Sequence, residues 1–255
     1  MSVVLVTGGT GGLGSKLVPL LRARGDDVRV LSRSSAGTHR GDLTSGVGIG
    51  DAVAGAELIV HAGSDTRRLG KADLAQTRHL LGAATAAGCR HLLFISIVGV
   101  DDHPFPYYRR KLRCEQEISA SGLPHTVLRA TQFHELLAML LRVAERLPVA
   151  PLPTVLPFQP VAAEEVAERI AELIHGDPAG RAEDFGGPEV LTLGAMTQTW
   201  RAHRGRPRRT VPLRVPGRSY RAFRAGRHTC PDHAAGHQTW ADFVSALPAR
   251  ERGVT

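Results

Sequence analysis

The amino-acid sequence predicts an α/β protein built around a doubly wound parallel sheet. Short, continuous apolar runs alternate along the chain with amphipathic stretches of helical period, and a cluster of glycines follows the first run. With 42% hydrophobic and 22% charged residues among 255, the chain can bury an ordinary core, which excludes global disorder. Apolar runs of this kind suit strands that are covered on both faces by crossover helices.

The elements are expected in regular alternation. Each apolar run predicts a buried strand, at 3–7, 28–31, 57–61, 91–97 and 125–129. Each stretch with apolar residues three or four positions apart predicts a helix, at 13–24, 72–87, 107–121, 133–147 and 163–175. Gly25, Gly88 and Gly122 follow three of these helices as stop signals. The alternation predicts βαβ units with parallel strands.

The composition changes after residue 147. Prolines at positions 148, 151, 153, 157 and 160 predict an extended apolar connection without a helix. We therefore expect a first domain at 1–147 and a smaller C-terminal region at 148–255. The helix within 161–175 is expected to pack back on the sheet. The rest of the region is expected to cap the open end of the sheet, where ligands bind in such folds.

The positive charge is concentrated in one stretch. The formal net charge is +8, and Val190–Pro231 contains no Asp or Glu, whereas ten arginines lie from Arg201 to Arg227. Clustered cations can bind nucleic acid by releasing counterions from its phosphates. No nucleic-acid motif or interleaved aromatic residues accompany the charge. The favoured interpretation is therefore an arginine-rich solvated face together with an anionic small-molecule partner.

The cysteines and the apolar runs indicate the compartment. Cys89, Cys114 and Cys230 are too few and too scattered for a disulfide framework. Nothing resembles a signal peptide, and the longest uncharged apolar run, Leu92–Val100, is too short to span a bilayer. We expect a soluble, cytoplasmic protein without a membrane partner.

The glycine cluster between the first strand and the first helix predicts a dinucleotide site. Its G-x-x-G-x-x-G spacing would allow a tight turn, a close approach of pyrophosphate to the backbone, and close packing of the helix on the strand. A P-loop does not fit, because Ser15 separates the last glycine from Lys16. The alternative is a purely structural turn. The residues expected to contact the cofactor here are Gly8, Thr10, Gly11, Gly12, Leu13 and Gly14.

The end of the second strand predicts which cofactor binds. NAD sites usually place an Asp or Glu there for the ribose hydroxyls, whereas this chain has Ser32, Arg33 and Ser34. A guanidinium and two hydroxyls suit a 2′-phosphate, so NADP(H) is expected over NAD(H). The alternative is that Arg33 is an ordinary surface arginine.

Together with this loop, the segments Tyr107–Lys111 and Leu128–His134 resemble a known family. The chain resembles an atypical short-chain dehydrogenase/reductase of the NmrA-like, NAD(P)-binding kind, related to the extended nucleotide-sugar epimerases. The resemblance implies a Rossmann-type doubly wound parallel sheet with a small C-terminal substrate-capping region. It also implies adenine contacts from Asp42 and Leu43.

The resemblance further implies that Ala62, Gly63 and Ser64 pass beside the nicotinamide half of the cofactor. For Ala62 and Gly63, close packing at a strand end is the alternative.

The resemblance also implies the catalytic residues. In this superfamily a Tyr-x-x-x-Lys pair carries the proton chemistry, and Tyr107 and Lys111 have that spacing, which places both on one face of a helix. The ammonium favours ionisation of the phenol and holds the nicotinamide ribose. Tyr108 is a rival for the tyrosine. Ser96 is the candidate for the third hydroxyl, although the family often carries it one or two residues later, and Ser96 could point into the core.

Two histidine features remain. His134 follows the strand at 125–129 at the carboxyl edge of the sheet, where it could bind substrate or act as a second acid. A helix start or a solvent-facing histidine is the alternative. A cluster near the C-terminus has irregular spacing and an intervening proline, so no metal site is expected; it comprises His228, Cys230, His233 and His237.

These observations favour an NADPH-dependent oxidoreductase. We expect it to reduce a carbonyl or quinone-like group of a small organic substrate with apolar or aromatic surface, with Tyr107 as the proton donor. Two alternatives remain open. One is a non-enzymatic NmrA-like redox sensor that binds NADP, and the other is an epimerase or dehydratase.

Overall fold

The computed structural model describes residues 1–34, 36–147, 149–204 and 209–248. Contacts divide the chain into two compact units. The sheet unit comprises Met1–Ala130 and Ala163–Asp184, and the C-terminal unit comprises Thr131–Ala162 and the described residues from Phe185 on. This division differs from the expected boundary after residue 147. The chain leaves the sheet unit as soon as its sixth strand ends at Ala130, so the proline run marks a connection within the C-terminal unit.

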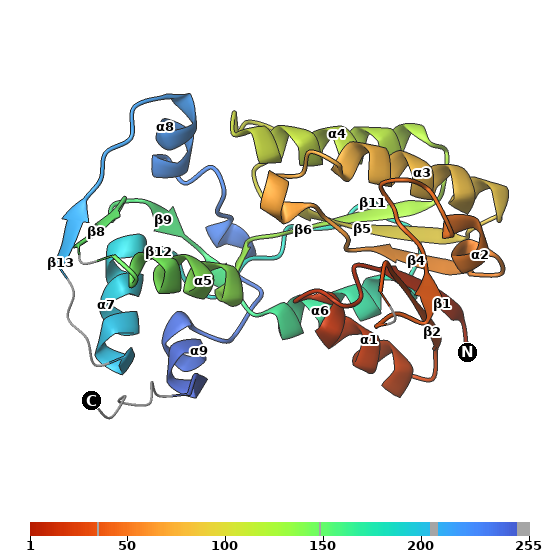
Figure 1. Cartoon of the computed structure of the whole chain (residues 1–255), viewed down its shortest axis with the longest axis horizontal. Helices are drawn as coiled ribbons and strands as arrows, with labels where there is room; N and C mark the ends of the chain where they lie inside the picture. Colours follow the sequence, from red (N-terminus) through yellow and green to blue (C-terminus); the bar gives the residue numbers. More distant parts are fainter. Residues whose placement is uncertain (35, 148, 205–208, 249–255) are drawn as a thin grey trace. The chain divides into compact units, whose positions relative to one another are not determined.

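The sheet unit contains seven parallel strands in the order β11-β6-β5-β4-β1-β2-β3 (Figure 1). This order confirms the predicted doubly wound sheet. The strands are β1 (Val3–Thr7), β2 (Asp27–Ser32), β3 (His39–Arg40), β4 (Leu58–His61), β5 (His91–Ile97), β6 (His125–Ala130) and β11 (Gly180–Arg181). Five of them match the predicted runs. β3 and β11 are two-residue strands, which are too short to show any periodicity.

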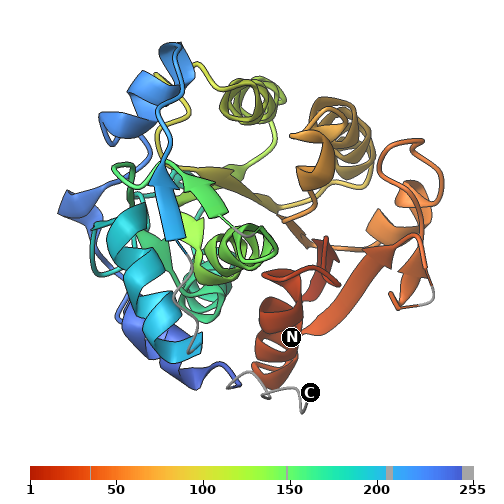
Figure 2. The ribbon, with the colours of Figure 1, turned by 60° about the vertical axis from the view of Figure 1, so that its left-hand side comes forward.

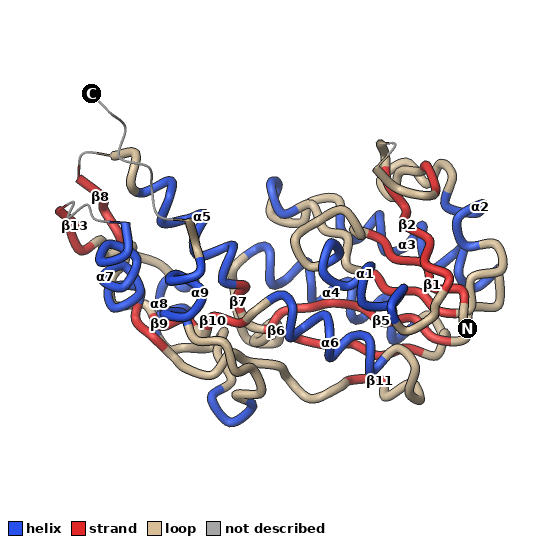
Figure 3. Tube along the Cα trace, turned by 90° about the horizontal axis from the view of Figure 1, so that it is seen from below, coloured by secondary structure: helices blue, strands red, loops and turns tan. Residues whose placement is uncertain are grey.

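Helices cover both faces of this sheet. Helices α3 and α4 lie side by side on one face, and α1 and α6 lie together on the other (Figures 1 and 2). The helices of this unit are α1 (Gly14–Ala23), α2 (Ile49–Val53), α3 (Asp73–Ala86), α4 (Pro106–Ala120) and α6 (Ala163–Leu173), with a 3-10 turn η1 at Thr66–Arg68. Helix α6 also contacts β6, beside which β11 runs (Figure 3). The helix expected within 161–175 therefore packs back on the sheet.

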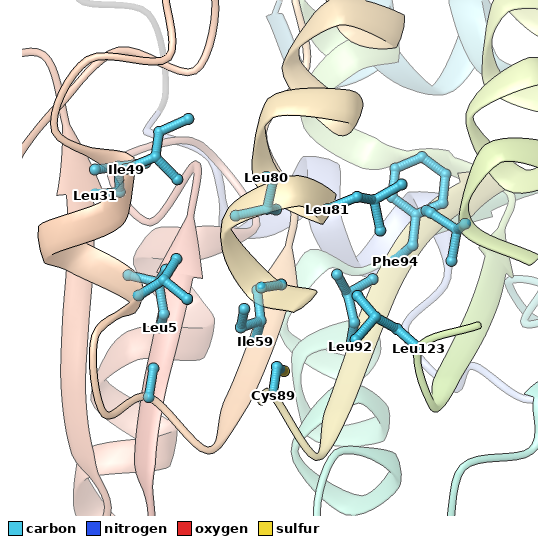
Figure 4. Packing of buried hydrophobic residues seen from close by; sticks show 14 of the residues in the cluster. Leu5, Leu31, Ile49, Ile59, Leu80, Leu81, Cys89, Leu92, Phe94 and Leu123 are labelled. Carbon is cyan, nitrogen blue, oxygen red and sulfur yellow. The ribbon is translucent and has the colours of Figure 1, made fainter. Parts of the chain in front are cut away.

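The register of the strands aligns the core on one face of the sheet. Leu5 pairs with Ile59 across β1 and β4, and Ile59 pairs with Leu92 across β4 and β5. All three side chains are buried, and they lie beneath Leu80 and Leu81 of α3 (Figure 4). Burial of each such side chain stabilises the fold by about 1.5–3 kcal/mol. Because α1 and α6 cover the opposite face as well, the central strands are apolar without alternation.

The C-terminal unit combines helices with three two-stranded pairs, β10-β7, β12-β9 and β13-β8. Its strands are β7 (Gln132–Phe133), β8 (Val149–Leu152), β9 (Pro157–Phe158), β10 (Pro160–Val161), β12 (Leu191–Thr192) and β13 (Arg209–Pro212). Its helices are α5 (His134–Ala144), α7 (Leu193–Arg204), α8 (Arg218–Arg224) and α9 (Trp240–Ala246), with a 3-10 turn η2 at Pro231–His233. Within this unit, α5, α7 and α9 share a core. Its role as a cap on the sheet stays a prediction.

Helices α7 and α9 were not predicted from the sequence. Leu193, Met196 and Trp200 of α7 are buried and stand three and four positions apart, which is helical spacing. Helix α9 begins with a capping box in which the Thr239 side chain accepts from the backbone N–H of Asp242. The many arginines and prolines around these helices made both patterns difficult to recognise in the sequence.

In the ranges that the structure describes, no helix has the length and apolar character needed to cross a membrane.

Candidate active site

The glycine loop requires two of its glycines for geometric reasons. Gly8 has φ +71°, and a Cβ there would stand 2.7 Å from the backbone nitrogen of Gly63 after β4. A Cβ on Gly14 would stand 2.3 Å from the carbonyl oxygen of Gly8, so α1 packs directly on the turn. By contrast, Gly11 and Gly12 are exposed, and a Cβ on Gly12 would meet nothing within 4 Å. Gly8 and Gly14 are therefore required by the geometry of the loop, whereas the loop surface at Gly11 and Gly12 is open.

The start of α1 fits an anionic group. In the part of the chain that the structure describes, the backbone N–H groups of Gly12, Leu13 and Gly14 make no hydrogen bond, while that of Gly11 donates to the Gly8 carbonyl (2.9 Å). The first turn contains no acidic residue, and no side chain caps the helix. Unpaired N–H groups at the positive end of a helix dipole are a binding site for phosphate. These residues fit the pyrophosphate of a dinucleotide.

The end of β2 presents hydroxyls and cations. The Oγ atoms of Ser32 and Ser34 lie 3.3 Å apart, and Arg33 between them is exposed. Strand β3 adds Arg40, which the register places opposite Ser32. The sequence did not single out Arg40, because β3 has no periodic signal. None of the described carboxylates forms an ion pair with Arg33.

The segment expected at the adenine has contacts of its own. The carboxylate of Asp42 accepts the backbone N–H of Thr44 (2.9 Å) and closes a local turn. Leu43 packs against Gly63, where a Cβ would stand 3.1 Å from its Cδ1 atom. Their contact with a cofactor stays a prediction.

Ala62 and Gly63 follow β4 and lie against the glycine loop. The backbone N–H of Gly63 donates to the Thr7 hydroxyl (3.3 Å), and a Cβ on Gly8 would overlap the backbone of both residues. Close packing at this strand end is therefore present. Small residues would also be needed beside the nicotinamide. That Ala62 and Gly63 lie there stays a prediction.

Tyr107 and Lys111 come together with Ser64 in the sheet unit. Helix α4 starts with Pro106 at its first position, so Tyr107 lies in the first turn, with its Oη 3.0 Å from Ser64 Oγ. Lys111, one turn later, is buried and donates to the Ile95 carbonyl (3.2 Å). Its Nζ also lies 4.7 Å above the Phe94 ring. The structure therefore joins residues from the loop after β4, from β5 and from α4 in one cluster.

Tyr108 lies in a different environment. It is buried, and its ring centroid stands 4.4 Å from that of His103 and 6.2 Å from that of Phe105. This aromatic cluster gives Tyr108 a packing role. Of the two tyrosines, it is the half-buried Tyr107 whose hydroxyl contacts Ser64.

Asp73 is a residue of this cluster that sequence analysis missed. It is the first residue of α3, it is buried, and its Oδ2 accepts the Ser64 hydroxyl (2.6 Å) and lies 3.8 Å from Lys111 Nζ. Its Oδ1 accepts the backbone N–H of Asp65 (2.7 Å). An acid in the first turn of a predicted helix is ordinary, so nothing in the sequence distinguished it from a helix-capping residue.

Ser96 stands near the end of β5 and is buried. Among the described residues its Oγ has no hydrogen-bond partner, and the hydroxyl bonded to Tyr107 belongs to Ser64. The neighbouring Ile95 carbonyl holds Lys111. A catalytic role of Ser96 stays a prediction.

His134 lies in the core of the C-terminal unit. The residue is fully buried, and its ring stacks on Phe243 (4.8 Å between centroids) and lies 5.9 Å from Trp240. This environment favours a packing role, so His134 is not carried into the proposed mechanism. Gln132 is likewise engaged, because its side chain donates to the His228 carbonyl (2.8 Å).

The C-terminal histidine and cysteine cluster does not converge. Within the described ranges, no three His, Cys, Asp or Glu side chains are arranged to hold a metal ion. His228 is instead hydrogen-bonded through Nε2 to the Pro157 carbonyl (2.7 Å), between Phe158 and Phe223.

His61 connects the glycine loop to α3. Its Nδ1 lies 2.7 Å from the Thr7 hydroxyl and its Nε2 3.3 Å from that of Thr77. Burial, and after it the charge of Lys111, lower the pKa of His61 to about 3, although the charge of Asp73 acts in the opposite direction. The ring is therefore neutral at neutral pH, with each nitrogen facing a hydroxyl.

We expect His61 to make the fold sensitive to acid. Its pKa of about 3 lies below the ordinary 6.5, so between these values the unfolded chain binds the proton and the folded chain does not. The contribution of neutral His61 to the free energy of unfolding is fully present above pH 6.5. It decreases as the pH drops, by about 2 kcal/mol at pH 5. Urea unfolding of the wild type and His61→Gln at pH 7, 6 and 5 measures this. The pKa of His91 is also lowered by burial, and it titrates in both proteins. Parallel pH curves would contradict the prediction.

The doubly wound parallel sheet and the open glycine loop after β1 define a Rossmann-type fold of the kind that binds a dinucleotide. Residues 8–175, more than half of the chain, match the NAD(P)H-binding family. The chain belongs to this NAD(P)H-binding family, which confirms the resemblance and the expected cofactor class. No curated protein matches the chain.

Several solved structures share the fold of this chain. One is an NADPH-dependent quinone oxidoreductase from Escherichia coli complexed with NADPH, which is 18% identical over 95% of this chain and 98% of that chain, with a TM-score of 0.80. Another is a nucleoside-diphosphate-sugar epimerase from Staphylococcus aureus, 17% identical over 96% and 100% of the two chains, with a TM-score of 0.79. A third is the NAD complex of UDP-glucose 4-epimerase from Thermus thermophilus, 21% identical over 83% and 86%, with a TM-score of 0.67. At these identities they show the fold alone.

Proposed function

We propose that this protein is an NADPH-dependent oxidoreductase that reduces a carbonyl or quinone-like group of a small organic substrate. The observation that carries the proposal is the cluster around Tyr107, in which a phenol, a serine hydroxyl and a buried ammonium meet in the sheet unit. A protein that only bound the dinucleotide would not need a phenol and an ammonium one helical turn apart. The fold shared with an NADPH-dependent quinone oxidoreductase adds support.

The residues divide the reaction between them. When bound, the nicotinamide supplies a hydride to the substrate carbon. Tyr107 donates its proton to the substrate oxygen, which completes a two-electron reduction of C=O to CH–OH. Lys111 stabilises the phenolate that this step leaves, because its ammonium is buried on the same face of α4.

The cofactor is held by three groups of residues in this proposal. The N–H groups of Gly12, Leu13 and Gly14 hold the pyrophosphate. Arg33, with Ser32 and Ser34, holds the 2′-phosphate, which selects NADPH. The segments 42–43 and 62–64 lie along the adenine and the nicotinamide.

We expect the selection of NADPH to depend on Arg33. Arg33→Ala should lose roughly 1–3 kcal/mol of binding free energy for NADPH, the range for hydrogen bonds to charged groups, and little for NADH. Isothermal titration of both cofactors into the wild type and the variant measures this difference. Arg22→Ala, a change of another exposed arginine, is the control. Equal affinities of the wild type for NADPH and NADH would contradict the assignment of Arg33.

A screen of quinones and aromatic ketones under NADPH tests the proposed reaction. The expected result is oxidation of NADPH that depends on both protein and substrate, with an equal amount of reduced product. Tight NADPH binding without oxidation by any of these compounds would favour the redox-sensor alternative instead.

An epimerase is the second candidate, because enzymes with that activity share the fold. An epimerase returns the hydride to the substrate, so the cofactor is not consumed. Conversion of a nucleotide sugar without net change of the cofactor would favour this candidate over the reductase.

A further inference from the structure

We propose that Asp73 is the positioning residue of the site and that it acts on Tyr107 through Ser64. The inference rests on the proposed function, because it gives Asp73 a part in that reaction. Asp73 is 2% exposed, and a buried carboxylate is costly unless donors and cations surround it. Here the Ser64 hydroxyl and the Asp65 N–H donate to it at 2.6 and 2.7 Å, and it forms an ion pair with Lys111.

The hydrogen bonds in this chain of contacts have a defined direction. An ionised carboxylate can only accept, so the Ser64 hydroxyl must donate its proton to Asp73. Ser64 Oγ is then an acceptor towards Tyr107, whose Oη lies 3.0 Å away and must be the donor. Asp73 therefore keeps the phenol of Tyr107 protonated in the absence of substrate, which is the form that a proton donor needs.

The backbone holds this chain of contacts tightly. Gly70 has φ +74°, and a Cβ there would stand 2.9 Å from Tyr107 Cδ2 and 3.0 Å from Asp73 Oδ2. The Asp73 N–H donates to the Gly70 carbonyl (3.1 Å), so the loop that ends at α3 closes on both side chains. Leu69, just before it, is the only non-glycine residue with positive φ among those described. A strained backbone of this kind is common where a site must be held in one geometry.

The charges around Tyr107 oppose one another. Lys111 comes from the same helix, Asp73 from the start of α3, and Asp65 from the loop before it. His61 at the end of β4 interacts electrostatically with Lys111 and Asp73 and is neutral at neutral pH. Lys111 favours the phenolate, whereas Asp73 and Ser64 favour the phenol. The pair formed by Asp73 and Ser64 thus directs the site towards proton donation.

The ionisation of Tyr107 can be followed without any substrate. The chain has three tyrosines, so the ultraviolet absorbance of phenolate can be titrated in the full-length protein, and Tyr107→Phe identifies the contribution of this residue. In Asp73→Asn we expect the Tyr107 phenolate to form at a lower pH than in the wild type, by about one pH unit. Asp51→Asn, which changes an exposed acid in the first turn of α2, is the matched control and should leave it unchanged.

Ser64→Ala distinguishes an effect that passes through the hydrogen bonds of Ser64 from an effect of the Asp73 charge alone. This variant keeps the carboxylate of Asp73 but removes the acceptor of the phenol proton, so the phenolate should again form at lower pH. It also serves as the second test if Asp73→Asn does not fold. A shift in Asp73→Asn without one in Ser64→Ala would overturn the inference, and so would an unchanged titration in Asp73→Asn.

Activity provides an independent measurement. In the reductase assay, Asp73→Asn should lower kcat on the order of tenfold, leave the KM for NADPH unchanged, and move the loss of activity at high pH to lower pH. A helix cap alone would change stability and not this pH profile, so an unchanged profile would overturn the inference. If the titration shifts as expected but no substrate is turned over, the inference about Asp73 is supported and the proposed reductase is contradicted.

Discussion

Tyr107→Phe is expected to lose turnover by about a hundredfold or more while binding NADPH as tightly as the wild type. The change removes only the hydroxyl that would donate the proton, and a positioned general acid contributes on that order. The ring would still pack against Gly70, so the loop and the fold should remain. Steady-state kinetics with an accepted substrate, together with a cofactor titration, measure the two effects separately.

Two further variants complete this test. Tyr108→Phe is the matched control, because Tyr108 packs against His103 and Phe105 and should keep most of the activity. Lys111→Ala should differ in kind and lose both turnover and part of the cofactor affinity. Full activity in Tyr107→Phe would remove this residue from the mechanism.

Gly11→Val is expected to weaken NADPH binding severely while the protein stays folded. A Cβ on Gly11 meets only the Gly8 carbonyl oxygen, at 3.2 Å, so the loop can accommodate it with a small shift. The branched side chain would then stand where the pyrophosphate approaches the start of α1, and affinity should fall by about a hundredfold or more. Titration of NADPH, with circular dichroism and thermal unfolding as the measures of folding, tests this.

Gly82→Val is the control for this substitution. Gly82 lies on the exposed side of α3, and a Cβ there would meet nothing within 4 Å, so the same change should leave cofactor binding intact. Normal NADPH affinity in Gly11→Val would show that the phosphate does not bind at this loop.

The sheet unit could be predicted from the sequence because its signals are local. The runs that form β1, β4 and β5 are mostly apolar without alternation, since helices cover both faces of the sheet, and the glycine loop follows β1 directly. The family resemblance singled out Tyr107 and Lys111, and their spacing placed both on one face of a helix. These features need no knowledge of residues that are distant in the chain.

Other features depend on residues that are far apart in the sequence. Asp73 looked like an ordinary first-turn acid until the fold brought Ser64 and Lys111 to its carboxylate. His134 was expected at an open edge, but Phe243 and Trp240, more than a hundred positions later, enclose it. Burial by a distant segment cannot be recognised in the local sequence around a residue.

The sheet unit is discontinuous in the sequence, and this has a consequence for how the chain folds during synthesis. Helix α6, which covers α1, and strand β11, which pairs with β6, are made only after the excursion through residues 131–162. Until they emerge, the part of α1 that α6 contacts and the edge of β6 remain uncovered, although every residue of the glycine loop and of the Tyr107 cluster has been made. Contacts between segments so distant slow folding and expose apolar surface in the meantime. The nascent dinucleotide-binding half therefore remains open to aggregation until residue 184 has been added, and a cofactor that bound the glycine loop early would stabilise it through that interval.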